Sequence, residues 1–104
     1  MTDTTPSRPI VFGEVLFDRF PDGSNVLGGA PFNVAWNLQA LGLAPLMISR
    51  VGRDDLGEEI LAAMRDWGLD TSGVQVDEVH STGTVDVTLE EGEPRFEIAA
   101  GRAY

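Results

Sequence analysis

The chain has 104 residues, no cysteine and one histidine, and its 17 acidic and 7 basic residues give a net charge of −10. This length allows one domain with a modest core, and the lack of cysteine excludes disulfides and thiolate metal sites. The negative charge would repel a phosphate backbone, so we expect no nucleic-acid partner. No apolar stretch has the length of a signal peptide core or a membrane span, which predicts a cytoplasmic protein without a membrane partner.

The first elements of the chain are expected to be extended. The run from Pro9 to Gly13 is short, continuously apolar and ends in glycine, which is typical of a buried parallel strand. Residues 14–20 continue the extended pattern, and Pro21 to Ser24 has the composition of a turn. We therefore predict a strand followed by a short excursion.

A glycine pair, Gly28 and Gly29, precedes the first predicted helix. Glycines let a ligand approach bare backbone N–H groups, and Pro31 suits the first helical turn, where its missing N–H costs nothing. The apolar positions at helical spacing, before a stop at Gly42, are Val34, Ala35, Leu38 and Leu41. The amide of Asn33 should point back toward the glycines. This opening is a candidate site for a small polar molecule, and the charge of the chain favours a neutral sugar over an anion.

A second strand, helix and strand follow. Leu46–Gly52 has the pattern of a buried strand, and Asp54 or Asp55 can cap a helix that runs to Trp67. We expect one face of that helix to carry Leu56, Ile60, Ala63, Met64 and Trp67, and we expect Trp36 and Trp67 to pack in the interior. Val74–Val76 is a short strand. This alternation is typical of a doubly wound α/β fold.

The pattern changes to strict alternation after Ser81. Residues 84–89 and 95–99 alternate in two around a turn-forming segment, which predicts a β-hairpin with one apolar and one polar face. This hairpin and the excursion at residues 14–26 can form a flap over the glycine site. His80 has no Asp or Ser partner at a recognisable spacing, so we expect a solvated hinge residue.

The glycines and the asparagine also have the spacing of a family signature. A Gly-Gly pair, a small residue, an Asn and a small residue are followed by two more glycines, and these positions are filled by Gly28, Gly29, Pro31, Asn33, Ala35, Gly42 and Gly52. In this the chain resembles the ribokinase-like (PfkB) carbohydrate kinase family, from about Ile10 to Tyr104. Residues 13–18, 52–57 and 81–83 extend the match, and residues 92–98 look most like the fructokinase branch.

The resemblance implies a partial Rossmann-like (ribokinase-like) α/β fold, in which helices flank a parallel sheet that carries a small antiparallel β lid. Residues 1–104 are then a single N-terminal segment of a kinase domain. The lid consists of residues 14–27 and 81–100, approximately. In this family two lids often pack together, so we expect a homodimer through the lid.

The resemblance also implies a set of sugar-binding residues. Asp18 falls on the family's sugar-binding aspartate, whose two oxygens accept hydrogens from neighbouring hydroxyls. Gly28 and Gly29 bring backbone N–H groups to the sugar, and Asn33 adds a donor and an acceptor. Phe96 and Ile98 align with positions that pack on the sugar ring, although alternation leaves open which face they occupy. Without the signature, Asp18 reads as a turn or edge carboxylate.

Family members run to roughly three times this length. Their Gly-Ala-Gly-Asp motif with the catalytic base, their Asn-x-x-Glu motif linked to magnesium and their nucleotide pocket have no counterpart here, and the chain contains no lysine and no phosphate-binding glycine loop. We therefore predict the sugar-binding part of an ATP-dependent, fructokinase-like carbohydrate kinase, with ATP and Mg²⁺ bound outside this chain and no catalytic or metal-ligating residue within it. Alone, the chain should be inactive. The alternative is a stand-alone, non-catalytic module for sugar binding or dimerisation.

Overall fold

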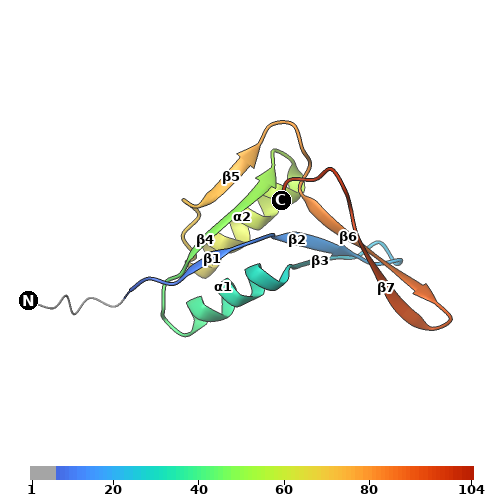
Figure 1. Cartoon of the computed structure of the whole chain (residues 1–104), viewed down its shortest axis with the longest axis horizontal. Helices are drawn as coiled ribbons and strands as arrows, with labels where there is room; N and C mark the ends of the chain where they lie inside the picture. The colour runs from blue at the N-terminus through green and yellow to red at the C-terminus, as the bar shows by residue number, and fades with distance from the viewer. Residues whose placement is uncertain (1–6) are drawn as a thin grey trace, which may run out of the picture.

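A computed structural model of the chain describes residues 7–104. The chain forms two units, which we call the base and the lid (Figure 1). The base is a three-stranded sheet with two helices, and the lid is a four-stranded sheet that extends from one end of it. The elements in chain order are β1 (Ile10–Phe12), β2 (Leu16–Arg19), β3 (Asn25–Gly28), α1 (Ala30–Ala40), β4 (Leu46–Gly52), α2 (Asp55–Trp67), β5 (Val74–Asp77), β6 (Gly83–Glu90) and β7 (Glu93–Ile98).

The base is built around β4. Its strands lie in the order β1-β4-β5, and both pairs are parallel, as predicted. Successive residues of β4 face opposite sides, so Met47 and Val51, four residues apart, share one face, and both are fully buried. The buried residues that pack with them from the helices are Phe32, Ala35, Ile60, Leu61 and Met64. Both helices therefore cover the same face of the sheet.

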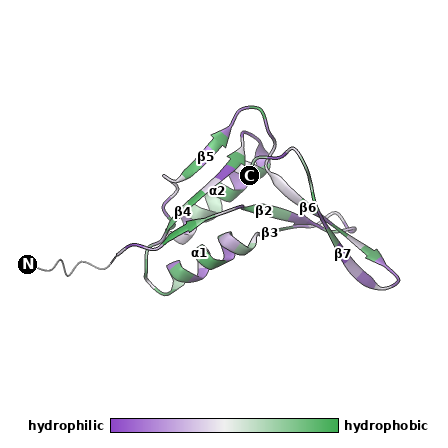
Figure 2. Cartoon of the chain, viewed as in Figure 1, coloured by the Kyte–Doolittle hydropathy of each residue, from purple (hydrophilic) through white to green (hydrophobic). Residues whose placement is uncertain are grey.

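The opposite face of the base sheet is open, and here the expectation of a buried β1 is wrong. Ile10 is 64% exposed and Phe12 is 81% exposed. Each new strand of the base is added on the same side of the previous one, in the order β1-β4-β5. Right-handed crossovers between strands added in this way place both connecting helices on one face of the sheet. β1 and much of β4 are hydrophobic (Figure 2), and some of these side chains are therefore covered by no helix of residues 7–104.

The lid sheet joins the two predicted flap segments. Its strand order is β3-β2-β6-β7, with antiparallel pairs at both sides. The central pair, β2 and β6, is parallel, so the lid is mixed where we expected an antiparallel sheet. The reason lies in the base: β2 follows β1 and β6 follows β5, and those two strands leave the base in the same direction.

The helices differ from the sequence pattern in which residues they bury. Asp54 caps α2 and Gly68 closes it in a left-handed conformation, as predicted. In α1, however, the predicted apolar positions Val34 and Leu41 are exposed. Trp67 was expected inside but is 40% exposed, because it stacks on Trp36 at the outer edge of the helix pair, with ring centroids 5.0 Å apart. Neither helix has the length and apolar character needed to cross a membrane.

Candidate functional site

The glycine pair lies where the lid joins the base. Gly28 ends β3 and Gly29 immediately precedes α1, with a φ of 106° that favours glycine. A Cβ at Gly29 would lie 2.8 Å from the carbonyl oxygen of Glu14, so a side chain has no room there. This junction therefore needs glycine both for its backbone conformation and for the close approach of the segment after β1.

Asp18 lies beside this junction, on β2. It pairs with Val26 of β3 on one side and with Val85 of β6 on the other. Its Oδ2 atom is 3.3 Å from the place that a Cβ would take at Gly28. The residue is half-buried, and its carboxylate makes no hydrogen bond or ion pair with any residue from 7 to 104. A partly desolvated carboxylate without a protein partner is suited to accept hydrogen bonds from a ligand.

The strand register settles the face that alternation left open. Residues directly opposite one another in neighbouring strands point to the same side of a sheet. Val85 pairs with both Asp18 and Ile98, so these three residues lie in one row on one face. Phe96, opposite Val87, lies on the same face one row nearer the hairpin tip. Ile98 and Phe96 are 63% and 64% exposed, so this face of the lid presents apolar side chains to the solvent.

Asn33 lies in the first turn of α1, next to the glycine pair. Its backbone N–H donates to the carbonyl oxygen of Gly29 at 2.9 Å, and its carbonyl accepts from Nδ2 of Asn37 at 2.9 Å. Its side chain is exposed, and its amide has no hydrogen-bond partner among the residues that the structure describes. Asp18, Gly28, Gly29 and Asn33 thus line one junction, with Ile98 two strands from Asp18 and Phe96 farther away.

A cavity of about 350 Å³ lies on the open face of the base, outside this group of residues. Its lining consists of Phe12, Gly13, Glu14, Ile48, Ser49, Arg50, Gln75 and Tyr104. Sequence reasoning did not select Arg50, whose guanidinium donates to Oε1 of Gln75 at 2.7 Å and lies 3.6 Å from Oδ2 of Asp77. The two-residue periodicity of β4 could have indicated that Arg50 faces the open side of the sheet, because Arg50 falls between the buried positions Ser49 and Val51.

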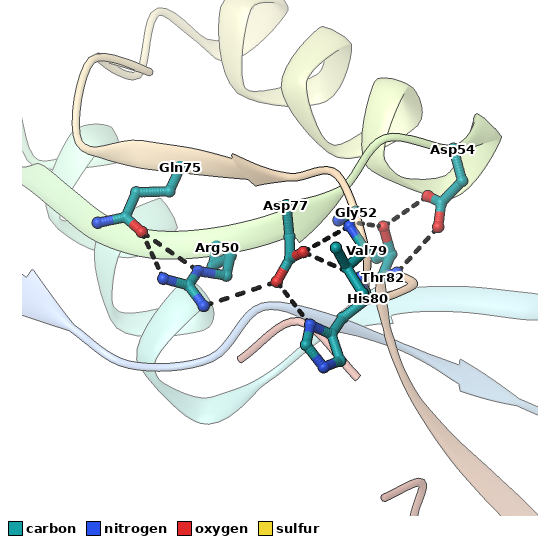
Figure 3. A network of polar contacts seen from close by, with 8 residues as sticks. All are labelled: Arg50, Gly52, Asp54, Gln75, Asp77, Val79, His80 and Thr82. Atoms are coloured by element: carbon teal, nitrogen blue, oxygen red, sulfur yellow. Dashed lines mark hydrogen bonds and ion pairs between the residues drawn. The ribbon is translucent and has the colours of Figure 1, made fainter. Parts of the chain in front are cut away.

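His80 does have an acidic partner, contrary to expectation. Its Nδ1 atom lies 3.0 Å from Oδ2 of Asp77, and the side chain is about half exposed (Figure 3). Backbone N–H groups of His80 and Val79 donate to the same carboxylate and lower the pKa of Asp77 to about 2. The three-residue spacing is that of a local turn closed by an Asp side chain, which a search for catalytic pairs passes over.

Asp54 contacts Thr82, the residue before lid strand β6, as well as the start of α2. Its Oδ1 accepts from the backbone N–H of Gly57 at 2.8 Å and from the hydroxyl of Thr82 at 2.6 Å. Burial on its own would raise the pKa of Asp54, but hydrogen bonds from Thr82 and Gly57 outweigh it and hold the pKa below its usual value. In residues 7–104 no three His, Asp or Glu side chains come together in a way that could hold a metal ion.

Residues 5–103 match the family described as pfkB family carbohydrate kinase. A putative sugar kinase of Pyrococcus horikoshii is 37% identical over 89 residues, which cover 86% of this chain and 27% of that protein. Its crystal structure superposes with a TM-score of 0.81 at 33% identity, over 91% of this chain and 36% of that one. The fructokinase of Escherichia coli is 36% identical over 91 residues, which cover 83% of this chain and 30% of that protein.

Another similar structure is that of Vibrio cholerae O395 fructokinase with fructose, ADP and calcium ion bound. It has a TM-score of 0.76 at 31% identity, over 93% of this chain and 34% of that one. The chain therefore spans about 30% of the length of the curated relatives it matches, and almost all of its own length is matched. Both the sequence and the fold place it in one group, and the chain belongs to the pfkB family of carbohydrate kinases.

Proposed function

We propose that this chain is the N-terminal, sugar-binding part of an ATP-dependent carbohydrate kinase with fructokinase-like substrate choice. The observation that carries the proposal is Asp18, a half-buried carboxylate without a protein partner in residues 7–104, beside the glycine pair. The fructose found in the V. cholerae relative supports fructose as the first sugar to test. Within the kinase domain, residues 14–27 and 81–100 act as the lid.

Each proposed contact follows from the chemistry of its group. The two oxygens of Asp18 accept hydrogens from adjacent hydroxyls, and charge-assisted hydrogen bonds of this kind are about twice as strong as neutral ones. Gly28 and Gly29 present main-chain groups without side chains in the way, and the amide of Asn33 offers one donor and one acceptor function. Ile98, and Phe96 beyond it, cover the apolar side of the sugar ring and exclude water.

Phosphoryl transfer needs groups that this proposal does not assign to the chain. The family's ATP-bound relatives support ATP as the donor, and Mg²⁺ is its usual partner. The described residues bring together no acidic cluster for a divalent cation, so we derive no step through ATP or Mg²⁺ from them. We propose that the general base and both cofactor sites lie outside this chain, that the chain alone is inactive, and that the kinase works in the cytoplasm, where ATP is available.

The test is an NMR titration of the chain with fructose, ribose and glucose. We expect the amides of Gly28, Gly29 and Asn33 to shift first, with a dissociation constant in the millimolar range or weaker, because the opposite wall of the site is incomplete. Asp18→Ala should abolish these shifts at the same sugar concentrations, since a charged hydrogen bond contributes about 1.5–3 kcal/mol. Asp86→Ala is the matched control, because Asp86 is exposed on β6 and faces the opposite side of the lid sheet from Asp18. Shifts confined to α2, or unchanged binding by Asp18→Ala, would contradict the proposal.

A second candidate role, dimerisation through the lid, is favoured by the exposed apolar face of the lid sheet. Val26, Leu89, Phe96 and Ile98 are all exposed on it. An apolar surface of this kind is more typical of an interface than of a free sheet face. Dimerisation through the lid is also a property that a stand-alone, non-catalytic module would retain.

A further inference from the structure

Several segments connect the lid to the base, and they differ in how firmly they are held. One junction, Gly28–Gly29 between β3 and α1, depends on glycine and carries no side-chain hydrogen bond among the described residues. The other main junction, His80–Thr82 between β5 and β6, lies against the start of α2 (Figure 3). The second junction is held by a side chain of the base.

Asp54 makes this connection with both carboxylate oxygens. Oδ2 accepts from the backbone N–H of Thr82 at 2.9 Å, and Oδ1 accepts from its hydroxyl at 2.6 Å. The same hydroxyl oxygen accepts from the backbone N–H of Gly52 at 2.9 Å. Thr82 is fully buried and Asp54 is half-buried, so the Thr82 side of these bonds is shielded from competing water. One carboxylate thus ties the end of β4 and the start of α2 to the residue that precedes β6.

Two glycines beside this contact let the backbone approach it closely. A Cβ at Gly52 would lie 2.5 Å from the backbone nitrogen of Thr82 and 2.7 Å from Oδ2 of Asp54. A Cβ at Gly57 would lie 3.1 Å from the Thr82 hydroxyl. On the far side, the chain after β7 returns, and the N–H of Ala103 donates to the carbonyl oxygen of Ser81 at 2.7 Å. Thr82 is therefore enclosed from both sides.

Thr82 connects directly to the strand that carries Asp18. Gly83, the next residue, pairs with Leu16, and Val85 pairs with Asp18. These pairs are parallel ladder contacts, so β2 and β6 move as one sheet. The pair of Val85 with Asp18 lies only two residues along the strands from the pair of Gly83 with Leu16, so a change in the position of Thr82 is transmitted to Asp18 over a short distance.

We infer that Asp54 is a positioning residue that acts through Thr82: it fixes the β6 side of the lid to the base and thereby sets the position of Asp18 relative to the glycine pair. The inference rests on the proposed function only in giving Asp18 a sugar to bind. Capping of α2, the second role of Asp54, uses the bond that Oδ1 accepts from Gly57, whereas Oδ2 accepts only from Thr82 among residues 7–104.

The test separates the two roles by substitution in the full chain. Asp54→Ser keeps a capping oxygen for α2 but is too short to hold both groups of Thr82. Thr82→Val removes only the hydroxyl, and Thr82→Ser restores it as the conservative rescue. Asp55→Ser, at the exposed neighbouring acidic residue, is the matched control.

The first readout is lid orientation, measured by residual dipolar couplings of the backbone amides. In the unmodified chain and in Asp55→Ser, couplings from the base and lid should fit a single alignment tensor. In Asp54→Ser and Thr82→Val, the lid couplings should depart from the tensor of the base while the helical circular dichroism is retained, and Thr82→Ser should restore the single fit. A single tensor in both altered chains would overturn the inference, whether or not sugar binds.

The remaining readouts cover the other outcomes. In the unmodified chain the Thr82 amide should exchange with solvent as slowly as the amides of β4, and exchange as fast as at the hairpin tip would overturn the inference even if the variants fail to fold. In fructose titrations, Thr82→Val should bind about 5- to 150-fold more weakly than Asp55→Ser, the usual range for coupling between sites. If no chain binds fructose but the couplings separate as expected, the proposed function fails and the positioning role stands.

Discussion

The exposed apolar face of the lid makes a quantitative prediction about self-association. Phe96 is 64% exposed, and fully burying a phenylalanine stabilises by about 1.5–3 kcal/mol. Phe96→Ala in a buried interface therefore removes about 1–2 kcal/mol per copy. A two-fold interface contains the residue twice, so the free energy of association weakens by about 2–4 kcal/mol. The dissociation constant of the dimer should rise roughly 30- to 700-fold.

The assay is sedimentation velocity over a concentration series. Phe12→Ala is the matched control, because Phe12 is 81% exposed but lies on β1, in the base sheet and not in the lid sheet. We expect Phe96→Ala to shift the monomer–dimer transition to higher concentration and Phe12→Ala to leave it in place. Both residues are exposed, so neither change should lower the melting temperature by more than a few degrees.

Two results would refute this reasoning. If the unmodified chain stays monomeric at every concentration, the lid forms no dimer interface. If Phe12→Ala disrupts the dimer and Phe96→Ala leaves it intact, the chain associates through the open face of the base. Either outcome would remove dimerisation through the lid from the proposed function.

Three further predictions concern stability and are checked by urea unfolding. Met64→Ala should destabilise the fold by about 2–5 kcal/mol, because Met64 is fully buried in the core, whereas Met64→Leu should cost less than about 1.5 kcal/mol. Gly29→Ala should destabilise by more than about 1 kcal/mol and by clearly more than Gly92→Ala; both have positive φ, but only Gly29 lacks room for a Cβ. The lowered pKa of Asp77, about 2, means that its charge stabilises the fold above about pH 4 and that this stabilisation is lost as the pH falls toward 2. Asp77→Asn should therefore show a smaller loss of stability between pH 4 and 2 than the unmodified chain, and an identical pH dependence would contradict the role of this carboxylate.

Most of the elements and their order could be predicted from sequence because their signals are local, but β3 was not predicted as a strand. Glycine stops such as Gly42 and Gly68, the cap at Asp54 and the two-residue alternation of the hairpin each depend on a few neighbouring residues, and all appear in the structure. The local pattern already indicated the glycine pair and Asn33 as a site for a small polar molecule, and the resemblance added Asp18, Phe96 and Ile98.

The features that could not be predicted depend on contacts between distant residues. The parallel pairing of β2 with β6 joins Asp18 to Val85, and nothing in either segment specifies that partner. The bond from Asp54 to Thr82 spans 28 residues and was not expected. Burial of β1 was wrongly inferred because an apolar run shows that a strand is hydrophobic and does not show which of its faces is covered.

The stacked tryptophans provide the chain with an optical reporter of its own. Trp36 and Trp67 lie nearly parallel at 5.0 Å, and the indole N–H of Trp67 donates to the carbonyl oxygen of Trp36 at 3.0 Å. Two indoles held this closely couple their electronic transitions, and the circular dichroism signal of this coupling disappears when they separate. They are the only tryptophans in the sequence, and both belong to helices of the base. Their signal therefore reports unfolding of the base alone, and a lid that loosens while the base stays folded leaves it unchanged.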